Sequence, residues 1–248
     1  MKAAPVDITT GELTRDRRRI STPRPATPRK MADVVSRLVR YFEWDGPVGC
    51  AFPARVKRGV PITATNIDPA CVGDNIAERF SQRTGLPVHV LNDADAAGVA
   101  EMSYGAGKGR QDLVLVLTVG TGIGSALFIR QTLIPNTELG HVNVKGRNGE
   151  KYASDAARQR KELNWSDWAR RFQHYLNRIE HLIGPDLIIL GGGISNPKKR
   201  GNYFRKLTST AELKTADLGN TAGIVGAAMY AASLSAGSDV VAPVLRAP

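Results

Sequence analysis

Hydrophobic residues recur at helical spacing in two long stretches of the chain. The first predicts a helix with Thr27 as N-cap and Pro28 as the first helical residue. Its apolar face comprises Met31, Val34, Val35, Leu38, Val39 and Phe42. The second stretch, residues 165–183, predicts a long helix that Gly184-Pro185 ends. Its apolar stripe comprises Trp168, Phe172, Tyr175, Leu176, Ile179 and Leu182.

Shorter apolar runs between turn residues predict buried strands. We expect strands at 48–52, 88–91, 113–118, 125–130 and 187–190, and further helices at 76–83, 94–102 and 222–232. The run at 113–118 is the most apolar, and with 125–130 it predicts a hairpin. The alternation of strands and helices favours an α/β fold, with a flexible link at 104–109 between two lobes.

Composition and charge narrow the classes of function. The 248 residues are 42% hydrophobic, which is typical of a globular protein, and no apolar run is long enough to span a bilayer. The polar N-terminus and two cysteines without metal-ligand spacing predict a cytoplasmic protein with free thiols. The net charge of +11 indicates an anionic partner or a solvated basic surface. Without a recognition-helix or RNA-binding motif, a nucleotide or polyphosphate is preferred to nucleic acid.

Two glycine-rich segments follow predicted strands. Residues 119–125 contain Gly120, Gly122 and Gly124, which allow backbone N–H groups to approach an anion. A strand and not a helix is predicted to follow, which favours a phosphate loop at a hairpin tip over a dinucleotide fold. A plain hairpin turn is the alternative. Residues 191–193 could seat a flat ring or a phosphate, or simply form a tight turn.

A carboxylate stands where the strand 88–91 gives way to a helix. Asn92, Asp93 and Asp95 lie at this point, and the carboxyl ends of strands in open α/β sheets are where ligands bind. Phosphoryl transfer to an alcohol requires a base that orients the hydroxyl and accepts its proton. Asp93 is our candidate for this base. The alternative is that Asp93 or Asp95 merely caps the helix.

A second polar cluster combines a carboxylate and an imidazole. Glu138 and His141 are three residues apart and could bracket vicinal sugar hydroxyls. Metal binding by His141 would need further ligands nearby, and no cysteine occurs in this region. An ordinary structural histidine is the remaining alternative.

Taken in order, these motifs resemble one family. The passages LNDADAAGVAEMSYGAGKG, LTVGTGIGSALF, PNTELGHV, LIILGGGIS and NTAGIVGAA are similar to the bacterial ROK sugar kinases, and most similar to their polyphosphate-using glucokinases and glucomannokinases. The resemblance covers nearly the whole chain and implies an actin-like (ribonuclease H-like) two-lobe α/β fold. It implies a first lobe at 1–107 completed by the helix 222–235, a second lobe at 108–221 and a tail at 236–248.

The resemblance also implies the activity and the residues that perform it. It implies phosphoryl transfer from polyphosphate or ATP, with Mg²⁺, to the 6-hydroxyl of glucose, by a homodimer with Asp93 as general base. The expected glucose ligands are Asn66, Asn92, Glu138, His141 and, less strongly, Glu150. The expected donor-binding residues are Lys108, Gly120, Thr121, Gly122, Gly124, Gly191, Gly192 and Gly193. No protein metal ligand is expected, since the cysteine cluster of many family members is absent.

The chain departs from the family pattern at its start. Family members open with a strand and an Asp-x-Gly-Gly-Ser-x-x-Lys-type loop, whereas residues 1–6 resemble only the end of that segment. Loss of the loop would remove phosphate-binding amides and a central strand of the first lobe. We favour a mis-assigned start, because the other site residues are present; the alternative is a non-catalytic sugar-binding remnant. A family transcription regulator would need a helix-turn-helix, which the sequence does not show.

Overall fold

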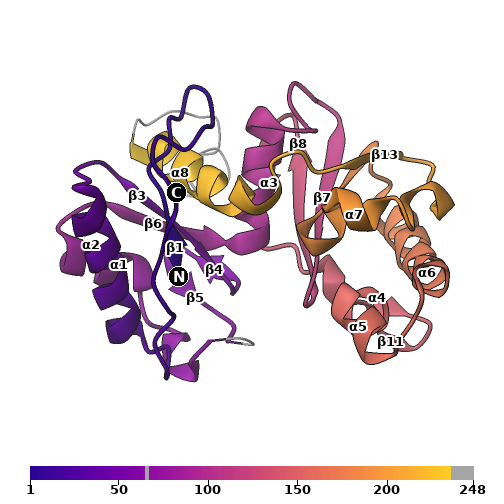
Figure 1. Ribbon diagram of the computed structural model, residues 1–248, viewed down its shortest axis with the longest axis horizontal. Helices are drawn as coiled ribbons and strands as arrows, with labels where there is room; N and C mark the ends of the chain where they lie inside the picture. Colours follow the sequence, from indigo (N-terminus) through magenta and orange to yellow (C-terminus); the bar gives the residue numbers. More distant parts are fainter. Residues whose placement is uncertain (65–66, 236–248) are drawn as a thin grey trace. The chain divides into compact units, whose positions relative to one another are not determined.

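The chain folds into two compact units, each with its own sheet and core. The computed structural model describes residues 1–64 and 67–235. Unit 1 comprises residues 1–100 and those from Thr221 onward, and unit 2 comprises residues 101–220 (Figure 1). The predicted boundary at 107/108 therefore falls inside unit 2. The predicted tail, 236–248, lies outside the described residues.

A parallel strand pair forms the centre of unit 1. β3 (Val48–Phe52) pairs with β6 (Val88–Asn92), with Phe52 opposite Asn92. The helices α1 (Pro28–Phe42) and α2 (Ile76–Thr84) pack against each other beside this pair. Side chains from both helices and both strands form one core, which includes Met31, Val35, Phe52, Ile76, Phe80, Val88 and Val90.

Helix α8 (Ala222–Ser235), at the other end of the described chain, also belongs to unit 1 and packs on β3 and β6. Two glycines let α8 come this close to its neighbours: Gly49 on β3, and Gly226 on α8 itself, which faces Ala96 of the helix that begins at Asp93. A Cβ at Gly49 would lie 1.8 Å from the carbonyl oxygen of Ala227, and one at Gly226 would lie 1.7 Å from that of Ala96. Since no side chain fits at these distances, the helix approaches its neighbours through bare backbone.

Smaller elements complete unit 1. Two antiparallel pairs form, β1 (Lys2–Ala3) with β2 (Arg18–Arg19) and β4 (Val56–Lys57) with β5 (Val60–Pro61). A short 3-10 turn, η1, spans Pro69–Cys71. Cys50 is half-buried and Cys71 is buried, both as free thiols, and burial raises the pKa of Cys50 to about 12.

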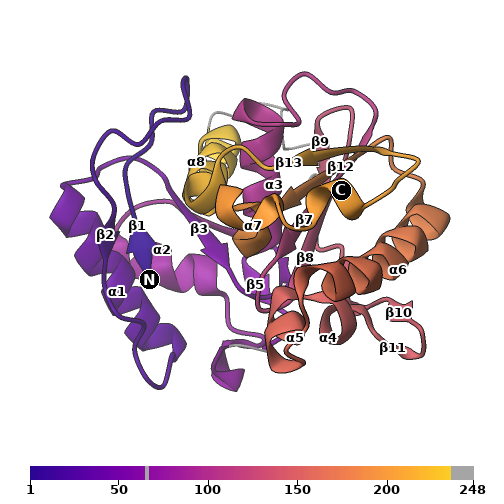
Figure 2. The ribbon, with the colours of Figure 1, turned by 45° about the vertical axis from the view of Figure 1, so that its right-hand side comes forward.

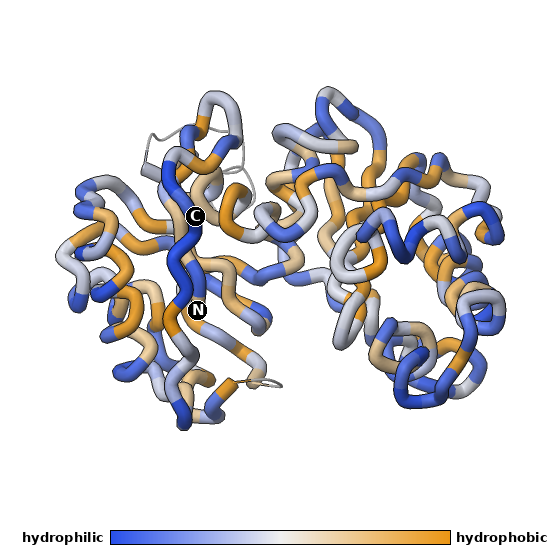
Figure 3. The backbone as a smooth tube through the Cα atoms, in the orientation of Figure 1, coloured by the Kyte–Doolittle hydropathy of each residue, from blue (hydrophilic) through white to orange (hydrophobic). Residues whose placement is uncertain are grey.

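Unit 2 is built on a five-stranded mixed sheet in the order β13-β12-β7-β8-β9. The strands are β7 (Leu113–Val119), β8 (Ile123–Ile129), β9 (Thr132–Ile134), β12 (Leu187–Gly191) and β13 (Glu212–Thr215). β13, β12 and β7 run parallel, while β7–β8 and β8–β9 are antiparallel. The strands β7 and β12 are almost fully buried, as their hydrophobic sequences require (Figure 3).

Helices cover this sheet and hold its core. α3 (Asp93–Tyr104) leads into unit 2, and α6 (Trp165–Ile183) runs beside the sheet, near α4 (Gly149–Ala153) and α5 (Asp155–Arg160) (Figure 2). Unit 2 also contains the short helix α7 (Pro197–Arg200) and the 3-10 turns η2 (Leu139–His141), η3 (Gly192–Ser195) and η4 (Phe204–Lys206), and a further 3-10 turn, η5 (Gly219–Thr221), lies where the chain returns to unit 1. The short strands β10 (Asn143–Val144) and β11 (Arg147–Asn148) form an antiparallel pair. The core is aromatic at its centre and contains Trp168, Phe172, Tyr175 and Tyr203.

One detail of the predicted helices was wrong. Thr27 is the N-cap residue of α1 and Pro28 its first residue, as predicted, although the side chain of Thr27 accepts no capping hydrogen bond. On α6 the predicted stripe is buried except at Leu182, which is 47% exposed. Leu182 lies in the last turn, before Gly184 ends the helix in a left-handed conformation, and in this turn Ile183 and not Leu182 packs against the core.

Candidate functional site

In unit 1, the predicted catalytic segment lies at the carboxyl end of β6. The strand ends at Asn92, and α3 begins at Asp93 without an intervening loop. The amide Nδ2 of Asn92 donates to the carbonyl of Ala54 at 3.0 Å, which ties this point to the segment after β3. Asp93 is exposed, and its Oδ1 accepts a hydrogen bond from the N–H of Ala94 at 2.9 Å.

The cap of α3 is Asn92 and not an aspartate. Its Oδ1 accepts hydrogen bonds from the N–H groups of Ala94 at 2.8 Å and Asp95 at 3.1 Å. Asp95 itself is 1% exposed. Asp93 thus has its carboxylate at the exposed first turn of a helix, where the helix dipole stabilises negative charge. An exposed carboxylate at this place is accessible to a substrate hydroxyl, as a general base must be.

In unit 2, residues 120–124 form the tip of the β7–β8 hairpin, which we term the glycine hairpin. The N–H of Gly120 donates to the carbonyl of Gly122 at 3.0 Å, and Thr118 pairs with Gly124. Thr121 is exposed at the tip. The predicted succession of strand, glycine loop and strand is confirmed.

Glu138 precedes the turn η2, His141 is its last residue, and the two side chains face each other. The distance from His141 Nε2 to Glu138 Oε2 is 3.3 Å, and Asn148 Nδ2 lies 2.9 Å from His141 Nδ1. Because an amide nitrogen can only donate, Nδ1 accepts and Nε2 carries the proton that faces Glu138. Glu150 Oε1 lies 3.9 Å from the same ring. Two carboxylates, an amide and an imidazole therefore converge, with His141 and Glu138 47% and 38% exposed.

Glu150 joins this cluster to the glycine hairpin. Its Oε2 accepts a long hydrogen bond of 3.4 Å from the N–H of Ile123, and a Cβ at Gly122 would lie only 2.3 Å from it. The carboxylate occupies the space that a side chain at Gly122 would fill. The structure thus brings Glu138, His141 and Glu150 next to the glycine hairpin.

Residues 191–193, which we term the glycine turn, lie next to the glycine hairpin. β12 and β7 are parallel neighbours, with Gly191 opposite Thr118, so both loops leave the same edge of the sheet. Gly192 has φ +77°, and a Cβ there would lie 2.7 Å from the backbone N and O of Val119. Only glycine fits that conformation and that approach. Two glycine loops and three polar side chains thus form one site in unit 2.

Some predicted residues do not join this group. Lys108 is exposed in the turn after α3, where its N–H donates to Gly105, and the described hydrogen bonds and ion pairs do not link its side chain to the hairpin. Asn66 lies outside the described residues. Asn92 and Asp93 belong to unit 1, whereas the glycine loops belong to unit 2.

The sequence analysis missed a buried charge cluster beside the glycine loops. The side chain of Asp155 is 5% exposed and accepts hydrogen bonds from Arg158 Nε at 2.8 Å, Gln159 Nε2 at 3.1 Å and Lys199 Nζ at 2.8 Å. Arg158 and Gln159 follow Asp155 at helical spacing, which was a readable signal. Lys199 is 44 residues away, and no local pattern could have identified it.

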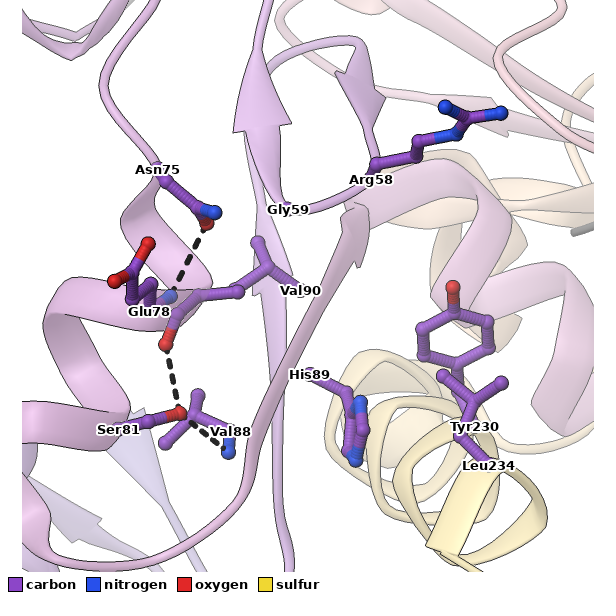
Figure 4. A pocket seen from close by; sticks show the side chains of 11 residues that line it. Arg58, Gly59, Asn75, Glu78, Ser81, Val88, His89, Val90, Tyr230 and Leu234 are labelled. Atoms are coloured by element: carbon purple, nitrogen blue, oxygen red, sulfur yellow. Dashed lines mark hydrogen bonds between the residues drawn. The ribbon is translucent and has the colours of Figure 1, made fainter. Parts of the chain in front are cut away.

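A separate cavity of about 280 Å³ lies in unit 1 (Figure 4). It borders the first residues of β6, between α2 and α8, and its lining includes Asn75, Ser81, Val88, His89, Tyr230 and Leu234. Burial lowers the pKa of His89. None of the predicted site residues lines this cavity. Within 1–64 and 67–235, no group of three or more potential metal ligands occurs, and no helix is long and apolar enough to cross a membrane.

Comparison with known proteins places the chain among sugar kinases. The sequence pattern of the ROK family matches residues 6–156. A polyphosphate glucokinase of Mycobacterium tuberculosis is 44% identical over 230 residues, which are 92% of this chain and 86% of the relative. A polyphosphate glucokinase of Mycobacterium leprae is 42% identical, over 92% of this chain and 70% of the relative.

Solved structures agree with the sequence comparison. The inorganic polyphosphate/ATP-glucomannokinase of Arthrobacter sp. strain KM superposes with a TM-score of 0.87 at 42% identity, over 94% of each chain. A ROK family glucokinase of Streptomyces griseus, solved with glucose and AMPPNP, gives a TM-score of 0.74 at 27% identity, over 93% of this chain and 95% of the other. These likenesses confirm the predicted actin-like α/β fold.

Proposed function

Because the chain belongs to the ROK family, we propose that it transfers a phosphoryl group from inorganic polyphosphate or ATP to the 6-hydroxyl of glucose. The observation that supports this most directly is in unit 2. There Glu150 links the Glu138–His141 pair to the glycine hairpin, and the glycine turn leaves the same edge of the sheet. Groups suited to sugar hydroxyls thus lie beside backbone suited to phosphates.

Sugar binding is assigned to the polar cluster. Glu138 and Glu150 can accept hydrogen bonds from hydroxyl groups, and the proton on His141 Nε2 can be donated to a sugar oxygen in place of Glu138. We include Asn66 and Asn92 among the sugar ligands because of the family resemblance. Side chains fixed in this way orient the acceptor hydroxyl, which is the main requirement of phosphoryl transfer.

Asp93 is the proposed general base. Its carboxylate is exposed at the start of α3, where the helix dipole stabilises negative charge. It would orient the 6-hydroxyl and accept its proton as the oxygen attacks the terminal phosphorus of the donor. The bond from that phosphorus to the bridging oxygen breaks, and the shortened polyphosphate or ADP leaves with the electron pair.

The donor is assigned to the two glycine loops. The N–H groups around Gly120, Gly122 and Gly124 would contact phosphate oxygens, with Thr121 at the tip, and residues 191–193 would lie along the donor. Lys108 would contribute positive charge. Mg²⁺ enters the proposal bound to donor phosphates, a mode that needs only one or two protein carboxylates.

The test is a coupled assay for glucose 6-phosphate with polyphosphate and ATP supplied in parallel. Wild-type protein should form product, and the Asp93→Asn variant should lose about 10²- to 10⁴-fold in kcat while still binding glucose by calorimetry. Full turnover by D93N would reject the assignment of the base. Glucose binding without turnover from either donor would indicate a sugar-binding protein without kinase activity.

A cytoplasmic homodimer completes the proposal. The homodimer is proposed from the resemblance to the ROK kinases. The cytoplasmic location is proposed because Cys50 and Cys71 are free thiols, as is usual in a reducing compartment. Size-exclusion chromatography with light scattering measures the mass directly. A mass equal to one chain at micromolar concentration would reject the homodimer.

A further inference from the structure

Lys199 is a cation held beside the glycine turn. It lies in α7, immediately after η3, and its side chain is 36% exposed. A Cβ built on Gly193 would lie 4.0 Å from Lys199 Nζ and 3.7 Å from the carbonyl oxygen of Val119. The ammonium group is therefore close to the exposed backbone of the glycine turn, at the point where it meets the last residue of β7.

A buried carboxylate fixes this ammonium group. Lys199 Nζ donates to Asp155 Oδ2 at 2.8 Å, and Arg158 Nε donates to Asp155 Oδ1 at 2.8 Å. Burial alone would raise the pKa of Asp155, but the hydrogen bonds from Lys199 and Arg158 outweigh burial and lower it. Two cations thus share one ionised carboxylate, which leaves a net positive charge at a fixed position.

Helix α5, which carries Asp155 and Arg158, connects this charge to the glycine hairpin. The N–H of Ala156, next to Asp155, donates to the carbonyl of Gly120 at 3.0 Å. Arg158 is held in turn by the ring of Trp165, with its guanidinium carbon 4.1 Å from the ring centroid. The cationic group is therefore held by Asp155 close to the glycine turn, and the residue after Asp155 is bonded to the glycine hairpin.

We propose that Lys199 binds the phosphate chain of polyphosphate where it passes the glycine turn, with Asp155 as its positioning residue. This inference rests on the proposed function and extends it to the part of the donor remote from the transferred group. Arg200 follows Lys199 in α7 and is exposed, so positive charge continues beyond the turn. A linear polyanion has a charge on every unit and can use such a track, whereas the charge of ATP ends after three phosphates.

The experiment compares Lys199→Met with Lys198→Met, which removes the same charge from the same helix. Lys198 is exposed and has no described side-chain partner, so it controls for the loss of net charge. We expect K199M to raise KM for polyphosphate roughly tenfold, the effect of losing one charge-assisted contact, with less change in kcat. We expect K198M to change KM for polyphosphate by less than about twofold. We also expect KM for polyphosphate to rise less steeply with salt concentration in K199M than in the wild-type protein.

A binding measurement separates this inference from the proposed function. Fluorescence anisotropy with labelled polyphosphate of fixed length, at equal salt, gives Kd without turnover. Weaker binding by K199M than by K198M supports the inference even if no product forms, in which case only the proposed activity fails. Equal Kd values for wild type and K199M would overturn it, as would a wild-type protein that phosphorylates glucose from ATP but does not bind polyphosphate. Circular dichroism of each variant confirms folding.

Discussion

At the scale of single residues, the glycines of the hairpin have different surroundings. A Cβ at Gly122 would meet Glu150 Oε2 at 2.3 Å, whereas one at Gly120 would meet nothing within 4 Å. The clash at Gly122 involves the far end of a flexible side chain, so the fold can accommodate it if Glu150 moves. The open space at Gly120 is where a phosphate is proposed to pack.

This difference predicts that two alanine substitutions affect different substrates. Gly122→Ala should displace Glu150 and raise KM for glucose roughly tenfold, with a smaller effect on the donor. Gly120→Ala should raise KM for the donor and leave KM for glucose nearly unchanged, because its methyl group occupies space reserved for phosphate. Steady-state kinetics with each substrate varied in turn measures both. The same pattern of changes in the two variants would contradict the assignment.

The roles of Asn92, as helix cap and as hydrogen-bond donor to Ala54, could not be predicted from the sequence. The motif indicated a helix start at this point, and it offered Asp93 and Asp95 as caps because aspartate suits that role. The structure assigns the cap to Asn92, whose amide also donates to Ala54. The contact with Ala54 is made across 38 residues of sequence, and only the pairing of β3 with β6 creates it.

At the scale of elements, Glu180 fixes α6 to the segment that precedes β13. Its Oε1 accepts hydrogen bonds from the hydroxyls of Ser209 and Thr210 and from the N–H groups of Thr210 and Ala211, at 2.6–3.2 Å. Burial alone would raise the pKa of Glu180, but these donors outweigh it and lower the pKa below its ordinary value of 4.5. The ionised carboxylate thus stabilises the folded state.

The lowered pKa predicts a pH-dependent contribution to stability. The contribution is complete above pH 4.5 and is lost as the pH falls through the lower pKa of the folded protein. Glu180→Gln keeps the acceptor oxygen without the charge, so it should lower the free energy of unfolding by about 1 kcal/mol at pH 7. Urea titrations of both proteins should converge on acidification. A difference that stays constant down to pH 3 would show that Glu180 does not titrate in this way.

Elements with a strong repeat of their own were predictable. The bounds of α6 and the existence of the β7–β8 hairpin follow from apolar spacing and from glycine at the turns, although β8 begins two residues earlier than predicted, at Ile123. β13 was not predicted, because its sequence, Glu-Leu-Lys-Thr, carries charge at an exposed sheet edge and has little apolar signal. The proximity of the two glycine loops also could not be read locally, since it depends on β12 pairing with β7.

At the scale of the whole chain, Glu101 connects the two segments that pass between the units. It is the first residue of unit 2 and is 1% exposed. Its carboxylate accepts hydrogen bonds from the N–H groups of Ala106 at 3.1 Å, Asp217 at 3.1 Å and Leu218 at 2.9 Å. The last two residues lie just before the chain returns to unit 1 at Thr221. A single side chain therefore binds the start and the end of unit 2 together.

Removal of this carboxylate should destabilise unit 2. Glu101→Ala leaves three backbone N–H groups without their acceptor and should lower the free energy of unfolding by about 3 kcal/mol. Glu12→Ala, at an exposed loop position, is the matched control and should change it by less than about 0.5 kcal/mol. Guanidinium titrations followed by circular dichroism give both values. Similar stabilities for the two variants would contradict a structural role for Glu101.

The close seating of α8 also has a consequence for biosynthesis. Unit 2 is one continuous segment, whereas unit 1 needs residues from both sides of it, with α8 seated against Gly49 and Ala96. The ribosome therefore synthesises all of unit 2 before it synthesises the helix that unit 1 requires. Until α8 has been synthesised, the surfaces of β3 and β6 that it covers stay exposed. During this interval the emerging polypeptide most needs protection by chaperones.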